Sequence, residues 1–204
     1  NGPPPRQALA RVRELGCPVV MGNTDAWLLD PAGTEGLPKV VGDRMAWCAK
    51  QLNDDELDFV RTFEPTVELD LGGASLLCFH GSPRSFNDVI LDVTPADALA
   101  PMLDGADHAL LAGGHTHLPL LRRLGAQTLL NPGSVGLPFR AVAQPGRPMR
   151  ALPHAEYALV SAEDGLLSVA LRRVALPLEA MFEAAGDVGL PEAEAWCAMW
   201  DAPA

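Results

Sequence analysis

The sequence has few cysteines, no cysteine pair at metal-ligand spacing and no long apolar run. Cys17, Cys48, Cys78 and Cys197 are widely separated, and no Cys-x-x-Cys motif is present. This spacing argues against a zinc-structural or redox protein and is typical of reduced, buried cysteines. No stretch approaches the roughly 18 apolar residues of a membrane span, and the N-terminus lacks the layout of a signal peptide. The sequence therefore predicts a cytoplasmic protein with no membrane partner.

Basic residues are also scarce. The chain has 15 Lys and Arg against 26 Asp and Glu, which gives a formal net charge of −11. Phosphate neutralisation along nucleic acid needs clustered positive charge, so a broad nucleic-acid surface is excluded. A small phosphate ester is still allowed, because an acidic protein can bind one through divalent cations. The sequence leaves the oligomeric state open.

The length and the pattern of apolar residues predict one α/β domain over residues 1–204. Hydrophobic residues make up 48% and charged residues 20% of the 204 residues, as in an ordinary globular protein. Residues 137–154 carry four prolines and read as a long surface loop. Helices are predicted near 5–15, in two pieces within 40–63 that meet at a cap on Asn53, and near 95–103, 177–185 and 191–200; strands are predicted near 18–21, 66–71, 75–79, 108–112, 118–123, 127–130, 156–161 and 166–174.

A pair of histidines follows one of these strands. The apolar run 110–112 is followed by Gly113-Gly114 and then by His115 and His117. Residues two apart in a strand share one face, and neighbouring glycines let backbone and ions approach closely. The pattern indicates a metal site at the end of a strand.

Three other strand ends carry polar residues of a similar kind. Asn23, His80 and the turn over 131–136 all lie just beyond a predicted strand, where open α/β sheets place their ligands. Imidazoles and an amide oxygen suit a divalent ion such as Mn, Fe, Ni or Zn. His108 and His154 do not combine a strand end with a glycine, so we interpret them as histidines satisfied by hydrogen bonds.

These residues resemble the motifs of the calcineurin-like metallophosphoesterases, and specifically of their small bacterial and archaeal phosphodiesterase branch. The segments Gly22-Asn23-Thr24-Asp25, His80-Gly81 and Gly114-His115-Thr116-His117 occur in the order of that family. Asn131-Pro132-Gly133-Ser134 adds a turn that is typical of the small branch. The resemblance extends over nearly the whole chain.

The resemblance implies a two-layered β-sandwich flanked by helices, in a four-layer αββα arrangement, with two divalent metal ions at the strand ends. Asn23, His80 and His115 would match ligands of one ion, and His117 would match a ligand of the other. Two such ions can bind phosphoryl oxygens and activate a water that attacks phosphorus. The implied activity is hydrolysis of phosphate esters, diesters rather than monoesters, with Mn as the expected metal.

The sequence departs from the family pattern in two places. No Asp-x-His and no Gly-Asp motif lies upstream of Asn23, and Asp43 after Gly42 reads as a helix-start or solvated acid rather than as their replacement. We therefore expect the chain to begin inside the fold, without its first strand. Thr24 stands where many relatives have a histidine that acts on the leaving group, so Asp25 would only brace the loop.

Two arginines complete the candidate site. Arg84 follows the His80 motif and Arg140 follows the 131–136 turn, so either guanidinium could bind a phosphate in a bidentate manner, or could be a solvated surface group. The departures also leave a second function open, in which the chain is a binding or scaffold module that keeps the fold without catalysis.

Overall fold

The structure is a computed structural model that describes residues 4–142, 144 and 146–201. Its elements, in chain order, are α1 (Pro5–Leu15), α2 (Asn23–Leu29), η1 (Pro31–Thr34), α3 (Lys39–Gln51), α4 (Asp54–Arg61), β1 (Thr66–Asp70), β2 (Ser75–Phe79), α5 (Ala96–Leu99), η2 (Ala100–Met102), β3 (Leu110–Ala112), β4 (Leu120–Leu124), β5 (Gln127–Asn131), β6 (His154–Glu163), β7 (Leu166–Ala175), α6 (Leu178–Asp187) and α7 (Ala193–Ala198).

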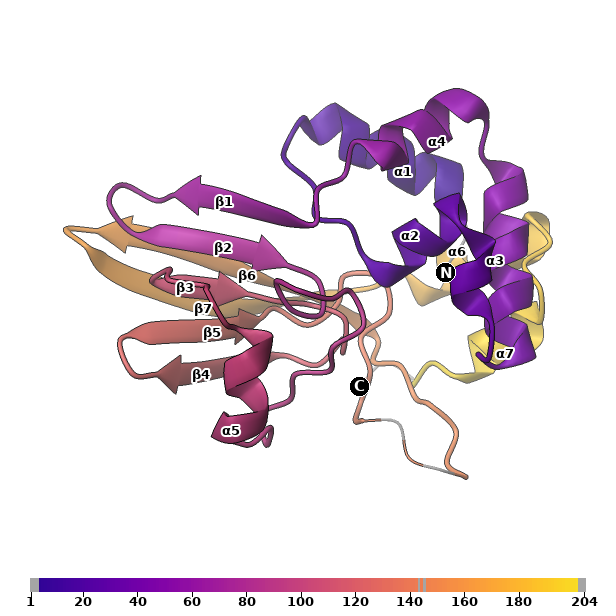
Figure 1. The fold of residues 1–204 in the computed structure, drawn as a ribbon. Helices are drawn as coiled ribbons and strands as arrows, with labels where there is room; N and C mark the ends of the chain where they lie inside the picture. Colours follow the sequence, from indigo (N-terminus) through magenta and orange to yellow (C-terminus); the bar gives the residue numbers. More distant parts are fainter. Residues whose placement is uncertain (1–3, 143, 145, 202–204) are drawn as a thin grey trace.

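A five-stranded mixed sheet in the order β1-β2-β3-β5-β4 lies in the left-hand half of the molecule in Figure 1. The inner strands β2, β3 and β5 run parallel, and β1 and β4 pair with them antiparallel at the two edges. In this register Leu111 of β3 lies between Leu77 of β2 and Leu129 of β5. Because parallel strands end at the same edge, the segments after β2, β3 and β5 leave the sheet together, on the side of α2 in Figure 1.

One face of this sheet packs against a second, two-stranded sheet. Leu76, Leu110 and Leu130 are buried against the β6–β7 hairpin, where Val160 and Val169 contact them. Side chains of a strand alternate between its two faces, so these leucines share one side of the sheet. The two sheets form the predicted β-sandwich.

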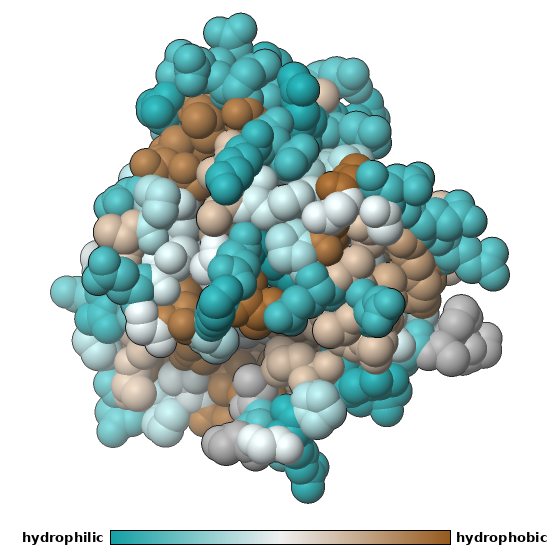
Figure 2. All heavy atoms as spheres, turned by 90° about the vertical axis from the view of Figure 1, so that its right-hand side faces the viewer, coloured by the Kyte–Doolittle hydropathy of each residue, from teal (hydrophilic) through white to brown (hydrophobic). Residues whose placement is uncertain are grey.

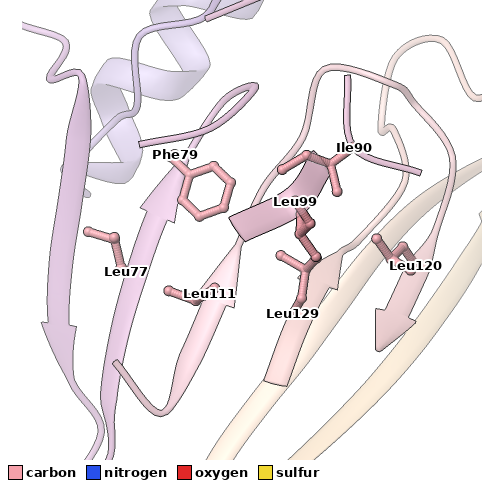
Figure 3. Packing of buried hydrophobic residues seen from close by; sticks show 7 residues of the cluster. All are labelled: Leu77, Phe79, Ile90, Leu99, Leu111, Leu120 and Leu129. Carbon is pink, nitrogen blue, oxygen red and sulfur yellow. The ribbon is translucent and has the colours of Figure 1, made fainter. Parts of the chain in front are cut away.

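The opposite face of the five-stranded sheet is covered by the chain between β2 and β3. Leu77, Leu111 and Leu129 point to this side, and Leu99 of α5 together with Ile90 packs over them (Figure 3). Leu111 is completely buried and Leu129 is 1% exposed. Because apolar residues fill both faces, the inner strands read in the sequence as continuous apolar runs. The predicted fold class, an α/β sandwich flanked by helices, is confirmed.

The remaining helices gather beyond one end of the sheet (Figure 1). Val60 of α4 is completely buried and packs with Met21 and Phe63 against α1. Trp196 of α7 packs in a separate cluster that also includes Trp47 of α3. The outward face of these helices is mostly hydrophilic, with separate hydrophobic spots (Figure 2). Across the part of the chain that the structure describes, the helices are too short or too polar to cross a membrane.

The helix between 40 and 63 is interrupted where the sequence predicts. The Asn53 side chain accepts a hydrogen bond from the Glu56 backbone at 2.9 Å, and the Glu56 carboxylate accepts one from the Asn53 backbone at 2.8 Å. This reciprocal capping satisfies two backbone N–H groups that the helix itself cannot satisfy. The predicted division into α3 and α4 is confirmed, as are the predicted α1, the strands β1, β2, β6 and β7 and the C-terminal helices.

The prediction of a strand over 18–21 is wrong. Val20 forms only a single parallel bridge, with Glu64. Proline has no N–H to donate, and both Pro18 and Pro65 lie close to this bridge, so the ladder ends after one pair. The apolar run is therefore a connection between α1 and α2 rather than a strand.

The loop predicted after residue 22 is also wrong, because Asn23 is the first residue of α2. The Asp25 carboxylate accepts a hydrogen bond from the Gly22 backbone at 2.9 Å and so fixes the start of this helix. A helix of seven residues is too short to show a clear 3.6-residue periodicity. Its cap residue is a glycine, which is a weaker signal for a helix start than Ser, Asp or Asn.

Candidate metal centre

Three of the predicted ligand side chains meet at the edge where the parallel strands end. Asn23 begins α2, His80 follows β2 and His115 follows β3. The Nε2 atom of His80 lies 2.7 Å from Oδ1 of Asn23 and 3.3 Å from Nδ1 of His115. The His80 backbone carbonyl also accepts a hydrogen bond from Gly114 at 2.7 Å, which ties the two loops together.

The spacing of these three atoms fits a shared divalent ion. Ligand atoms bound at about 2.1 Å to a tetrahedral or octahedral ion lie about 3.0–3.4 Å from one another. The 3.3 Å distance between His80 and His115 lies in that range, and the 2.7 Å distance between His80 and Asn23 is that of a hydrogen bond, slightly shorter than the range. An imidazole nitrogen and an amide oxygen both carry the lone pair that a metal needs. The donors therefore suit one divalent ion with positions left for other ligands.

The imidazoles of the cluster are in the form that binds metal. Burial and the neighbouring His115 and His117 lower the pKa of His80 to about 4. Burial also lowers the pKa of His115 and of His117 below the ordinary histidine value. A lowered pKa favours the neutral form of an imidazole, so a metal would compete less with protons for these three rings.

His117 is held separately from this group. Its Nδ1 atom lies 2.6 Å from the carbonyl oxygen of Leu137, and its ring stacks on Phe139 with centroids 4.9 Å apart and an angle of 16°. Because the Nδ1–H group donates to this carbonyl, Nε2 is the ring nitrogen that remains available to bind a metal ion. The loop that follows the 131–136 turn therefore sets both the tautomer and the ring plane of His117.

The donor set is small. Residues 4–142, 144 and 146–201 contain no group of three or more His, Cys, Asp or Glu side chains that could hold a metal ion. The third donor beside His80 and His115 is therefore the amide oxygen of Asn23. Asp43 lies elsewhere, in α3, where its exposed carboxylate is paired with Lys39 at 2.5 Å. The interpretation of Asp43 as a solvated acid is confirmed.

Thr24 and Asp25 lie beside Asn23 in the first turn of α2. The carboxylate of Asp25 is partly buried and its pKa is raised by desolvation, while its hydrogen bond from Gly22 opposes this shift. A Cβ atom at Gly22 would lie 3.0 Å from that carboxylate and 3.1 Å from the His80 ring, so the backbone passes closely between them. Asp25 thus fixes the segment that presents Asn23, as expected for a residue that braces the loop.

Both candidate arginines are paired with carboxylates. Arg84 Nε lies 2.9 Å from Asp88, whose pKa is lowered mainly by this hydrogen bond. Arg140 Nε lies 2.8 Å from Asp201, which also accepts from Arg150 at 3.1 Å. Asp201 is 9% exposed, so the long loop is clamped to the C-terminal segment by a buried carboxylate. Binding of phosphate by Arg84 or Arg140 stays a prediction.

His108 and His154 do not have the hydrogen bonds that the sequence suggests. Within the described residues, Nδ1 of His108 and Nε2 of His154 are buried without a hydrogen-bond partner. His154 instead lies 3.4 Å from the carboxylate of Glu156. The hydrogen bonds expected for these two histidines are therefore not formed at these nitrogens, while the interpretation of both as histidines outside a metal site is kept. Neither belongs to the cluster around His80.

Sequence reasoning missed the residues that support the ligands. Asp88, Leu137 and Phe139 position the loops around the cluster, and nothing local distinguishes them from other loop residues. Asn131 was visible only as part of a turn, although its amide bonds two residues of the histidine loop. Such contacts join segments far apart in the chain and become visible only in the folded protein.

The loop after His80 has no room for a side chain at Gly81. A Cβ atom there would lie 2.7 Å from the Ser85 carbonyl oxygen and 2.8 Å from backbone atoms of Asp88. We expect Gly81→Ala to displace this loop and to lower the free energy of unfolding by roughly 1–3 kcal/mol, as overpacking does. Chemical denaturation measures the change. Gly136→Ala is the control, since a Cβ there meets nothing within 4 Å; equal stability of the two variants would contradict the assigned loop packing.

Comparison with known protein families gives a match over most of the chain. A family model described as the calcineurin-like phosphoesterase superfamily domain matches residues 4–164. An uncharacterized protein of Methanocaldococcus jannaschii is 22% identical over 196 residues, which cover 94% of this chain and 78% of that relative.

Solved structures of similar fold have also been found. A hypothetical protein from Pyrococcus horikoshii OT3 superposes with a TM-score of 0.79 at 19% identity, over 95% of this chain and 78% of that chain. A metallophosphoesterase from Sphaerobacter thermophilus superposes with a TM-score of 0.68 at 25% identity, over 97% of this chain and 83% of that chain. The first of these similarities shows the fold alone.

Proposed function

Because the chain belongs to the calcineurin-like phosphoesterase superfamily, we propose that it is a divalent-metal-dependent hydrolase of phosphate esters and that it prefers diesters. The observation that carries this proposal is the convergence of Asn23, His80 and His115, whose donor atoms lie 2.7 and 3.3 Å apart. Neutral nitrogen and amide ligands support Mn, Fe, Ni or Zn as the metal, with Mn as the first choice.

Some residues around the cluster would bind metal, and others would orient the residues that do. Bound divalent ions supply Lewis acidity, which polarises phosphoryl oxygens and lowers the pKa of water. His80 and His115 would hold one ion together with Asn23, and His117 would offer Nε2 to a second. Asp25 holds the start of α2 in place through its bond to Gly22. Thr24 cannot protonate a leaving group as an imidazolium can, so leaving groups of low pKa would react fastest.

The pairing of the arginines supports the preference for diesters. A phosphate monoester carries up to two negative charges near neutral pH and a diester carries one. Arg84 and Arg140 are the candidates for balancing that charge, but each is already paired with a carboxylate, Asp88 and Asp201 respectively. A site with little free positive charge would favour the substrate with the lower charge.

The four cysteines support a reducing compartment. Cys17, Cys48, Cys78 and Cys197 are all free. Burial raises the pKa of the Cys48 and Cys78 thiols, which keeps them protonated and unreactive. We therefore propose the cytoplasm as the place of action and small phosphate esters as the substrates.

The proposal is tested with an aryl phosphodiester and the matching phosphomonoester. We expect activity to disappear after treatment with EDTA and to return with Mn²⁺, and kcat/KM to be at least about tenfold higher for the diester, about 1.4 kcal/mol in transition-state binding. Steady-state rates at matched metal concentration give both numbers. Turnover that is insensitive to EDTA would rule out the metal, and faster turnover of the monoester would rule out the preference for diesters.

A second candidate function is a scaffold module that keeps the fold without catalysis. The observation that favours it is that, within the described part of the chain, the donors that meet at the cluster are two imidazoles and an amide, all neutral, without a carboxylate. Neutral ligands do not offset the charge of an ion, so binding would be weak. Elemental analysis separates the two functions: about two ions per chain support the enzyme, and no retained metal together with no turnover supports the scaffold.

A further inference from the structure

The loop that carries the paired histidines has a strained backbone. His115 has a φ of 64° and His117 a φ of 59°, and only two other non-glycine residues of the described chain lie in this left-handed region. This conformation costs a residue other than glycine on the order of 1 kcal/mol or more. A loop with two such residues would relax to another conformation unless neighbouring groups held it. The ligand direction of both histidines therefore depends on those neighbours.

Asn131, the last residue of β5, is the side chain that bonds this loop. Its Nδ2 donates to the Gly114 carbonyl at 2.6 Å and to the Thr116 hydroxyl at 3.0 Å, and its Oδ1 accepts from the Gly133 backbone at 2.9 Å. Gly114 and Thr116 are the two residues on either side of His115. The amide thus holds the backbone carbonyl of the residue directly before one of the strained positions and the side-chain hydroxyl of the residue directly after it.

Asn131 is buried and its hydrogen-bonding capacity is used by these contacts. The residue is 4% exposed, and both of its N–H groups are donated. A primary amide offers two donors and an acceptor on one planar group, which no carboxylate or hydroxyl of similar size does. The arrangement therefore requires asparagine itself, and the buried amide is committed to the loop and not exposed toward a substrate.

We propose that Asn131 is a positioning residue that directs His115 and His117 toward metal, through its bonds to Gly114 and Thr116. This inference rests on the proposed metal-dependent function but deepens it, because it assigns the geometry of the ligands to a residue that binds no ion itself. Removal of the amide frees the Gly114 carbonyl and the Thr116 hydroxyl, the two groups that tie the strained loop to β5 on either side of His115. The imidazoles then lose their fixed direction, while the fold around β5 stays intact.

The chain offers a matched control at the opposite end of the same strand. Gln127, the first residue of β5, also donates both N–H groups to backbone carbonyls, to Ala106 at 2.7 Å and to His108 at 2.9 Å. Gln127→Leu removes two donated hydrogen bonds, the same number as Asn131→Leu, although one bond of Asn131 goes to a hydroxyl and Asn131 also accepts from Gly133. The control therefore shows how much metal binding changes when β5 loses two amide donors that do not contact the histidine loop.

The test compares Asn131→Leu and Asn131→Asp with Gln127→Leu by titration with Co²⁺, followed by visible absorption. The aspartate keeps the acceptor for Gly133 and loses both donors, which isolates the bonds to the loop. We expect Co²⁺ affinity to fall about 10–100-fold in both Asn131 variants, as for other residues that orient metal ligands, and to stay within twofold in Gln127→Leu. Wild-type affinity in Asn131→Leu would overturn the proposal.

A second measurement needs no metal and so separates this proposal from the proposed function. The ring nitrogen resonances of His115 and His117 are recorded by NMR in metal-free protein. We expect both to shift or broaden in Asn131→Leu and to keep their positions in Gln127→Leu. Unmoved resonances overturn the positioning role. Failure of the wild-type protein to bind Co²⁺, together with shifted resonances in Asn131→Leu, overturns the metal-dependent function and leaves the control of the histidine loop by Asn131 in place.

Discussion

Replacing His80 or His115 with alanine is expected to reduce Mn²⁺-dependent hydrolysis of an aryl phosphodiester by at least about 100-fold, since loss of a residue that merely orients a ligand already costs 10–100-fold. The effect at His80 should be the larger, because its Nε2 atom contacts both other donors of the cluster, at 2.7 and 3.3 Å. Elemental analysis of the same variants should show that bound metal is lost along with activity.

The control for these variants is His108→Ala. His108 lies just before β3, at the end of the strand opposite to His115, and takes no part in the cluster. We expect the activity and the metal content of the His108→Ala variant to match those of the wild-type protein. Wild-type turnover in both His80→Ala and His115→Ala would contradict the assignment of the site. Equal loss in His108→Ala would mean that the activity reports folding and not ligand chemistry.

Leu111→Ala is expected to destabilise the protein by about 2–5 kcal/mol, the range for a leucine removed from a packed core. Leu111 is 0% exposed and lies in β3 between Leu77 and Leu129, under the cover of Leu99 (Figure 3). Because a domain of this kind is stable by only about 5–15 kcal/mol, the loss is a large share of the total. The midpoint of urea unfolding measures it.

Leu121→Ala in β4, the edge strand of the same sheet, is the matched control. Leu121 is 50% exposed, so its truncation removes little buried surface and should change stability by about 0.5 kcal/mol or less. If the two variants unfold at the same denaturant concentration, the packing of α5 against the sheet is not the main apolar core. Since β3 leads directly into His115, Leu111→Ala also tests whether this core holds the ligand loop in place.

Much of the fold could be predicted because short stretches of sequence determine its elements. The central strands are short apolar runs that end in Gly, Asn or His, and the cap at Asn53 is visible as a motif. The two elements that were wrong failed for different reasons. The run over 18–21 depends on a distant contact, a single bridge from Val20 to Glu64, whereas α2 is held by a local bond between Gly22 and Asp25 but is too short, at seven residues, to show a helical period.

The candidate site was predictable to a similar degree. The side chains of Asn23, His80 and His115 were named from motifs, and the structure brings them together. The state of the arginines could not be predicted, because Arg140 meets Asp201 across 61 residues. Only tertiary structure decides whether a guanidinium is free for a ligand or already paired, and no local pattern encodes that choice.

The positions of the donors along the chain have a consequence for the kinetics of folding. Asn23 and His80 are 57 residues apart and His80 and His115 are 35 residues apart, so the cluster forms only when distant segments have docked. Contacts of this separation form late, because the entropy of closing long loops must first be overcome. An ion held there stabilises the native state more than the folding transition state. Metal should therefore slow unfolding far more than it accelerates folding.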